Sequence, residues 1–147
     1  MTAQQGGEED ESLPEAFWGV ARQLRHLSRE TLQPWEVTPG QARAVHVLTR
    51  HGVMRLSELA ERLRIVPRST TEVVDSLQER GLVERRPDPH DRRATLVALT
   101  EEGAKVAVAI RWARDAEAER FFGGLSEPDR DHLARILNQL RGQARAD

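Results

Sequence analysis

Two short segments of the chain combine residue types that suit contact with nucleic acid. The first is Pro67-Arg68-Ser69-Thr70-Thr71-Glu72. Short hydroxyl side chains let a helix approach a duplex closely, and an arginine can pair with a guanine edge. The second is residues 87–93, a turn that ends in two arginines suited to phosphates or a minor groove. A helix start that simply favours Ser and Thr remains an alternative for the first segment.

Other kinds of chemistry lack the residues they need. The chain has no cysteine, which excludes disulfides, thiolate metal sites and thiol catalysis. The five histidines show no metal-ligand spacing, and no phosphate loop or nucleophile elbow is present. We therefore expect no cofactor, no metal and no enzyme activity. The histidines are His26, His46, His51, His90 and His132.

The charge of the chain is concentrated in its middle. With 147 residues the chain has the length of about one domain, and its formal net charge is −2. Residues 43–93 carry 11 basic and 8 acidic side chains, whereas both flanking segments are net acidic. This bias fits a nucleic-acid contact face, although chance variation on a solvated surface explains it as well. Residues 1–11 read as a disordered acidic tail without signal-peptide features, so we expect a cytoplasmic protein.

Capping signals predict four helices in the first half. Ser12 with Glu15, and Thr38 with Gln41, form capping boxes for a long helix over residues 12–32 and for a second helix ended by Gly52. Ser57 is expected to cap a third helix. Pro67 opens a fourth helix, which ends at Gly81. About three residues connect the third and fourth helices, a spacing typical of a helix-turn-helix.

After the fourth helix, the spacing of apolar residues changes from one typical of a helix to one typical of a strand. Residues 82–85 and 95–99 read as two strands around the turn 87–91, which makes a hairpin. Thr100 caps a long helix that Gly123-Gly124 ends, and Ser126 begins a last helix. The fold class expected is mostly α with a small β wing: a winged helix-turn-helix lobe over residues 38–100, flanked by helical dimerisation regions at 12–34 and 101–147.

Ordered motifs give the central block a resemblance to a known family. It is carried by Leu56-Ser57-Glu58-Leu59-Ala60-Glu61-Arg62-Leu63, by Leu77-Gln78-Glu79-Arg80-Gly81-Leu82-Val83-Glu84-Arg85, by Asp91-Arg92-Arg93 and by Leu99-Thr100-Glu101-Glu102-Gly103. Over residues 38–105 the chain resembles the MarR family of bacterial transcriptional regulators. The resemblance implies a homodimeric winged-helix protein, usually a repressor, that small aromatic molecules often release from DNA.

The resemblance also implies roles for particular residues. Asp75 falls on a recognition-helix acid that pairs with the wing arginine in relatives, here Arg93. The chain departs from the family at Val66, where many relatives have a capping Ser or Thr, and at Glu72, where many have a basic residue. Glu72 either accepts a hydrogen bond from the amino group of a cytosine or forms an ion pair on the protein surface. The residues expected at DNA are Arg68, Ser69, Thr70, Thr71, Glu72, Asp91, Arg92 and Arg93.

Two further groups have both a functional and a structural interpretation. Trp18, Arg22, His46 and Arg111 could line an effector cleft, although the tryptophans could equally be packing residues. Apolar residues near both ends predict a dimer interface, or could instead close a monomeric core. The expected interface residues are Phe17, Phe121, Phe122, Leu133, Leu137 and Leu140.

The function expected is a sequence-specific, homodimeric regulator that binds a pseudo-palindromic operator in double-stranded DNA and represses transcription. A small aromatic effector would release it. The alternative is a winged-helix protein-interaction module without specific DNA binding, which Glu72 and the acidic overall charge favour.

Overall fold

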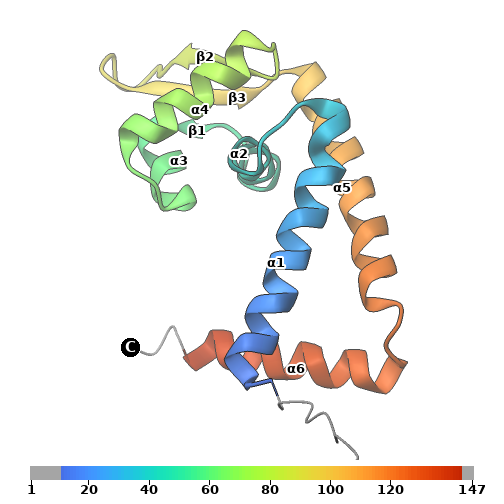
Figure 1. Ribbon diagram of the computed structural model, residues 1–147. Helices are drawn as coiled ribbons and strands as arrows, with labels where there is room; N and C mark the ends of the chain where they lie inside the picture. Colours follow the sequence, from blue (N-terminus) through green and yellow to red (C-terminus); the bar gives the residue numbers. More distant parts are fainter. Residues whose placement is uncertain (1–10, 144–147) are drawn as a thin grey trace, which may run out of the picture. The chain divides into compact units, whose positions relative to one another are not determined.

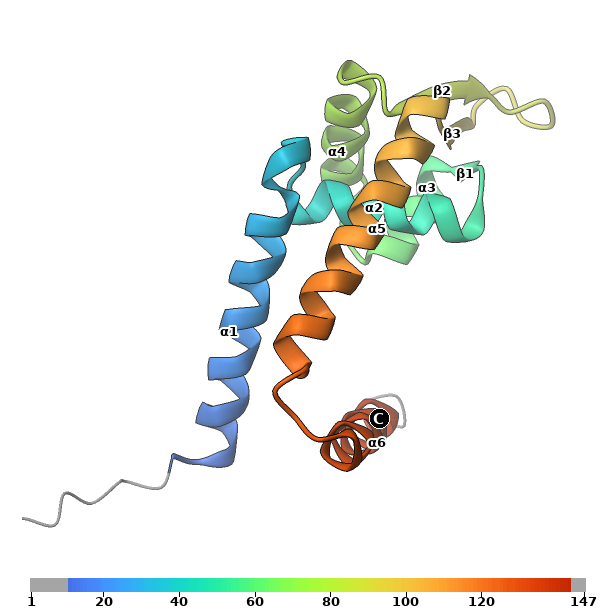
Figure 2. The same cartoon turned by 90° about the vertical axis from the view of Figure 1, so that its right-hand side faces the viewer.

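The computed structural model describes residues 11–143, so the expected tail at 1–11 lies, apart from Glu11, outside the described part. The chain forms two compact units, one up to Val108 and one from Ala109 onward, and their boundary falls within one helix. Figure 1 and Figure 2 show the elements in two views. They are α1 (Leu13–Leu32), η1 (Gln33–Trp35), α2 (Pro39–His51), β1 (Met54–Arg55), α3 (Leu56–Leu63), α4 (Pro67–Glu79), β2 (Val83–Pro87), β3 (Thr95–Leu99), α5 (Glu101–Phe122) and α6 (Glu127–Gln143).

The first two helices begin where the capping boxes predict. The Ser12 hydroxyl accepts from the Glu15 backbone N–H, and the Glu15 carboxylate accepts in return from the Ser12 N–H. Thr38 and Gln41 form the same reciprocal pair at α2. These bonds satisfy donors that a helix start otherwise leaves unpaired, so both predicted helix starts are confirmed.

The start of α3 differs from the prediction. Arg55, extended at the end of β1, is the N-cap, and its side chain makes no capping bond. Ser57 therefore lies inside the helix as an exposed residue, and its predicted capping role is wrong. The reason is tertiary: pairing of β1 with β3 holds Arg55 extended, so the chain turns into α3 directly after it.

The hairpin gains a third strand. The antiparallel sheet has the order β1-β3-β2, with Met54 opposite Val97 on one side of β3 and Arg85 opposite Val97 on the other. Pro87, expected in the turn, pairs with Thr95 as the last residue of β2. The position is compatible with proline because β2 is an edge strand, where a missing N–H need not break a ladder. The β2–β3 loop projects from the lobe in both views (Figure 1, Figure 2).

A core of aliphatic side chains joins α2, α3, α4 and the sheet. Leu59 and Leu63 of α3, Val74 and Leu77 of α4, and Val97 of β3 are all almost completely buried. This core fixes the helix-turn-helix against the hairpin, because removal of such side chains from water is the main favourable term in folding.

The second unit lacks a core of this kind among its described residues. Ser126 caps α6, as predicted, since its hydroxyl accepts from the Asp129 N–H. No residue of α6 is buried, and its apolar residues Ile136 and Leu140 are 45% and 52% exposed. An apolar stripe without cover within the chain suggests cover from another molecule.

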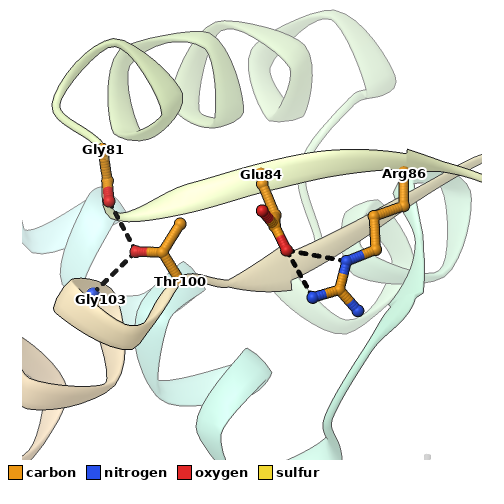
Figure 3. A network of polar contacts seen from close by, with 5 residues as sticks. All are labelled: Gly81, Glu84, Arg86, Thr100 and Gly103. Atoms are coloured by element: carbon orange, nitrogen blue, oxygen red, sulfur yellow. Dashed lines mark hydrogen bonds and ion pairs between the residues drawn. The ribbon is translucent and has the colours of Figure 1, made fainter.

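Hydrogen bonds at Thr100 link the start of α5 to the residues between α4 and β2 (Figure 3). The Thr100 hydroxyl donates to the Gly81 carbonyl at 2.6 Å and accepts from the Gly103 N–H at 3.0 Å, which confirms its capping role. The Thr100 N–H donates to the Leu82 carbonyl at 3.1 Å. A Cβ built at Gly103 would lie only 1.9 Å from that same carbonyl oxygen. Glycine at 103 is thus a condition for α5 to start where it does.

We predict that Gly103→Ala lowers the free energy of unfolding by at least about 2 kcal/mol, because the new methyl group must displace backbone atoms. Helix propensity alone predicts the opposite sign, a gain of up to about 1 kcal/mol. Gly40→Ala in α2 is the matched control, since its nearest neighbour would lie at 3.9 Å. Urea denaturation followed by circular dichroism measures both variants. An unchanged or raised stability of Gly103→Ala would contradict the close approach.

Candidate nucleic-acid interface

The first turns of α4 are exposed and carry polar side chains. Arg68 and Glu72 lie one turn apart with 3.9 Å between Nε and Oε1, and their side chains are 92% and 71% exposed. Ser69 and Thr71 are half-buried, and the Thr71 hydroxyl donates to the Pro67 carbonyl. Val66 supplies no side-chain cap. The positive end of the helix dipole is thus left open, which favours an approaching anion.

Thr70 does not belong to this exposed surface. Its side chain is fully buried, and its hydroxyl donates to the Val66 carbonyl at 3.2 Å. The expected contact of Thr70 with DNA is therefore not compatible with its position. A signal for this was present in the sequence, because Thr70 precedes Val74 by four residues and Leu77 by seven, the spacing of one helix face.

The C-terminal half of α4 and its C-cap residue make hydrogen bonds to three other segments of the chain. Gln41 of α2 donates to the Ser76 hydroxyl at 2.7 Å. Arg80, directly after α4, donates to the carbonyls of Trp35 and Glu36. The third contact comes from β2. Together these contacts fix the orientation of α4 and leave Arg68 and Glu72 exposed near its N-terminus.

The contact from β2 corrects the expected partner of Asp75. Arg85 donates to the Asp75 carboxylate at 2.5 Å and also to the side-chain carbonyl of Gln78. Asp75 thus pairs with the strand at the base of the wing, not with Arg93. Arg85 was missed as a positioning residue, because only the pairing of β2 with β3 brings it alongside α4.

Two aspartates shape the wing turn. The Asp88 carboxylate accepts from the His90 N–H at 2.8 Å and from Arg55 of β1 at 2.8 Å, and the side chain is almost fully buried. The Asp91 carboxylate accepts from the Arg93 N–H at 2.9 Å. Asp91 therefore acts through the turn, as an aspartate commonly does. The side chains of Arg92 and Arg93 remain exposed.

The same contacts govern the ionisation of Asp88. The His90 N–H holds the pKa of the Asp88 carboxyl below its usual range, and Arg55 lowers that pKa further, against the opposing effect of burial. A lowered folded-state pKa means that this carboxylate stabilises the wing above about pH 4, and that its contribution is lost only at more acidic pH. The Asp88 carboxylate therefore keeps its charge throughout the neutral range.

The expected effector residues come from both compact units. Trp18 and Arg22 on α1 and His46 on α2 are exposed side chains of the first unit. Arg111, on α5, is exposed in the second unit. Trp18 makes an edge-to-face contact with Phe17, with ring centroids 5.9 Å apart. Among the described residues, no hydrogen bond or ion pair joins Trp18, Arg22 and His46 to one another.

The residues expected at a dimer interface are incompletely covered by their own chain. Phe17 on α1 is 50% exposed, and Leu140 on α6 is 52% exposed. Leu133 and Leu137 are half-buried. Phe121 and Phe122 pack edge to face at the end of α5 and are also half-buried.

Neither a metal site nor a membrane span is found in the described part of the chain. No group of three or more His, Asp or Glu side chains between residues 11 and 143 could hold a metal ion. Among those same residues, no helix has the length and apolar character needed to cross a membrane.

Comparison with known sequences identifies relatives over most of the chain. The family model described as MarR family matches residues 37–95. The HTH-type transcriptional repressor MdtR of Bacillus subtilis is 30% identical over 118 residues, which cover 80% of this chain and 76% of the relative. An HTH-type transcriptional regulator of Mycobacterium tuberculosis is 37% identical over 118 residues, with 80% of each chain covered.

Solved structures share the fold of this chain. The crystal structure of RV1404 from Mycobacterium tuberculosis has a TM-score of 0.77 and 28% identity, covering 94% of this chain and 95% of that one. A mutant MarR from E. coli, crystallised with operator DNA, has a TM-score of 0.75 and 24% identity, covering 87% and 92%. The sequence relatives, together with this shared winged-helix fold, show that the chain belongs to the MarR family of transcriptional regulators.

Proposed function

We propose that the chain is a homodimeric repressor that binds a pseudo-palindromic operator in double-stranded DNA. Membership of the MarR family already makes it a DNA-binding transcriptional regulator and not an enzyme. The observation that carries the finer proposal is the exposed, uncapped start of α4, which is the second helix of the helix-turn-helix and is accompanied by a wing with two exposed arginines. The repressor named MdtR and the neighbour crystallised with operator DNA support it.

The two parts of the interface have different roles in this proposal. Arg68, Ser69 and Thr71 enter a major groove with the N-terminal turns of α4, where Arg68 reads a base edge. Glu72 is positioned to pair with Arg68 when no DNA is present. Arg92 and Arg93 contact the phosphate backbone or a minor groove from the wing, while Asp91 shapes the turn that presents them.

A dimer places two such interfaces on one duplex. Two recognition helices meet successive major grooves on one face of B-DNA when they lie about 34 Å apart. The uncovered apolar residues of α1 and α6 support a second chain as their cover. A regulator of this kind works where the DNA lies, in keeping with the cytoplasmic location expected from the sequence.

We further propose regulation by an aromatic, anionic small molecule. A half-exposed tryptophan at position 18, with exposed Arg22 and His46, offers ring contact and positive charge to such a ligand. A ligand that binds one conformation of the protein more tightly than another changes DNA affinity without touching DNA.

The test of DNA binding is fluorescence anisotropy with the duplex upstream of the protein's own gene, at several salt concentrations. We predict that Arg93→Ala weakens binding to every sequence and reduces the slope of log K against log salt by about one unit for each phosphate that the arginine neutralises. Arg120→Ala, which removes an arginine already paired with Glu117, is the control and leaves both quantities unchanged. Wild-type affinity and slope in Arg93→Ala would exclude a DNA contact by the wing arginine. No binding by the wild type would favour the protein-interaction module.

For the dimer, we predict a mass of about 33 kDa by light scattering, twice the 16.6 kDa of one chain. Leu137→Asp shifts the wild-type dimer toward monomer, because a charge placed in an apolar interface costs several kcal/mol. Gln139→Asp is the matched control, since residue 139 lies on the opposite side of α6. A monomeric wild type at micromolar concentration would contradict the arrangement of two half-sites.

For the effector, we predict that at least one member of a panel of aromatic acids weakens the protein–DNA complex by about 5- to 150-fold. Trp18→Ala and Arg22→Ala should reduce this response and leave DNA affinity without ligand unchanged. Titration of each acid into the complex measures both quantities. Equal responses in wild type and both variants would show that the binding site lies elsewhere.

A further inference from the structure

The arginines of the DNA-binding lobe fall into two groups. All 11 basic side chains of residues 43–93 are arginines, and most of them are engaged within the chain. Engaged arginines donate to a carbonyl or lie within 4.0 Å of a carboxylate: Arg43, Arg55, Arg62, Arg68, Arg80, Arg85 and Arg86. The other four side chains, Arg50, Arg64, Arg92 and Arg93, are exposed and have no such partner among residues 11–143.

This division separates the arginines whose donors are already used within the chain from those whose donors are available to a phosphate. A guanidinium that donates to a carboxylate has part of its field cancelled, and it must give up that partner before binding a phosphate. Arg68 is the exception in this group, because at 3.9 Å from Glu72 and 92% exposed it pairs only weakly. A free guanidinium keeps its charge and its hydrogen-bond donors for an incoming phosphate. Two of the free arginines, Arg92 and Arg93, are the wing residues already proposed to contact DNA. The division therefore selects the expected wing residues on grounds independent of the family motif.

Arg64 lies in the turn between α3 and α4. It is the C-cap of α3, with φ 54° and ψ 43°, and it stands three residues before Pro67, the first residue of α4. Its backbone N–H donates to the carbonyls of Ala60 and Glu61. The helix-turn-helix connection thus holds the Arg64 backbone firmly, while the side chain is exposed to solvent.

The backbone conformation at Arg64 is unfavourable for an arginine. A left-handed φ brings Cβ close to the following carbonyl oxygen, so this position of a helix cap usually has Gly or Asn. Nothing within residues 11–143 compensates through the Arg64 side chain, which has no partner there. A strained residue whose side chain contributes no contact to the fold suggests a role outside the fold.

We infer that Arg64 binds a phosphate of the DNA backbone beside the start of α4. The inference rests on the proposed DNA binding and extends the interface to the turn that precedes the recognition helix. The guanidinium of Arg64 would hold the backbone from this turn, while Arg92 and Arg93 hold it from the wing. A phosphate contact of this kind positions α4 in its groove and reads no sequence.

The test compares variants that separate the charge of Arg64 from its backbone conformation. Arg64→Gly and Arg64→Asn remove the charge and suit the left-handed φ, so we expect thermal midpoints equal to or above that of the wild type. Arg64→Lys keeps the charge in the same strained position. Arg50→Ala is the matched control, because it removes another free arginine of the same lobe. The probes are the upstream duplex and a random duplex of equal length, and the readout is anisotropy over a salt series.

We expect Arg64→Gly and Arg64→Asn to weaken binding about fivefold for each subunit at about 0.15 M salt, and about 25-fold for a dimer. The slope of log K against log salt falls by about two units in the dimer, on both probes. Arg64→Lys keeps most of the slope, and Arg50→Ala keeps both affinity and slope.

Three outcomes would overturn the inference. If Arg64→Gly and Arg64→Asn bind like the wild type, Arg64 makes no phosphate contact, and the proposed function stands without it. If Arg50→Ala weakens binding as much, the total charge of the lobe, and not a contact at Arg64, sets the binding. If the wild type binds neither duplex at low salt, the proposed function fails and the inference falls with it.

Discussion

The arrangement of the DNA-binding lobe depends on one close approach, that of α5 to the Leu82 carbonyl at Gly103. The end of α4, the start of β2 and the end of β3 meet there, and the Thr100 hydroxyl bridges Gly81 and Gly103. Any side chain larger than hydrogen at 103 would separate α5 from Leu82. The aliphatic core supplies most of the favourable burial, but it is non-directional. The hydrogen bonds and the close contact at this junction determine where the long helix leaves the sheet.

From that junction outward, arginine serves two opposite purposes in the lobe. Arg85 and Arg80 donate to acceptors on or beside α4 and hold its C-terminal half, while Arg55 holds the wing through Asp88. Such arginines build the shape of the interface. The free arginines, Arg64 in the turn and Arg92 and Arg93 in the wing, supply the positive electrostatic field of the interface. A guanidinium suits both tasks because it always carries its charge and offers five donors in a rigid fork.

The helices α1 and α6 expose more apolar surface than the contacts within the chain can cover. On α1, Leu13, Phe17 and Trp18 are at least half exposed, and no residue of α6 is buried. Helix propensity and caps do not stabilise such helices enough by themselves, since most helical stability in proteins comes from tertiary packing. A second chain that covers these faces would supply that packing, and it would also place two lobes on one duplex.

The sequence alone determined the features that depend on neighbouring residues. The capping boxes at Ser12 and Thr38, the cap at Thr100 and the ends of the helices involve contacts over three or four residues, so type and spacing suffice to predict them. The order of helices and hairpin, and the family motifs, followed from the same local patterns. The exposed Arg68 and the wing arginines were predictable in this way as candidates for contact.

Only the tertiary structure decided which side chains face each other across elements. Thr70 is buried because its face of α4 packs on the core, and Asp75 pairs with Arg85 because β2 lies beside α4. Arg55 and Asp88 are 33 residues apart and meet only because β1 joins the sheet. That pairing also moved the start of α3 ahead of Ser57. Local spacing states which residues share a face, but the packing of elements decides what that face contacts.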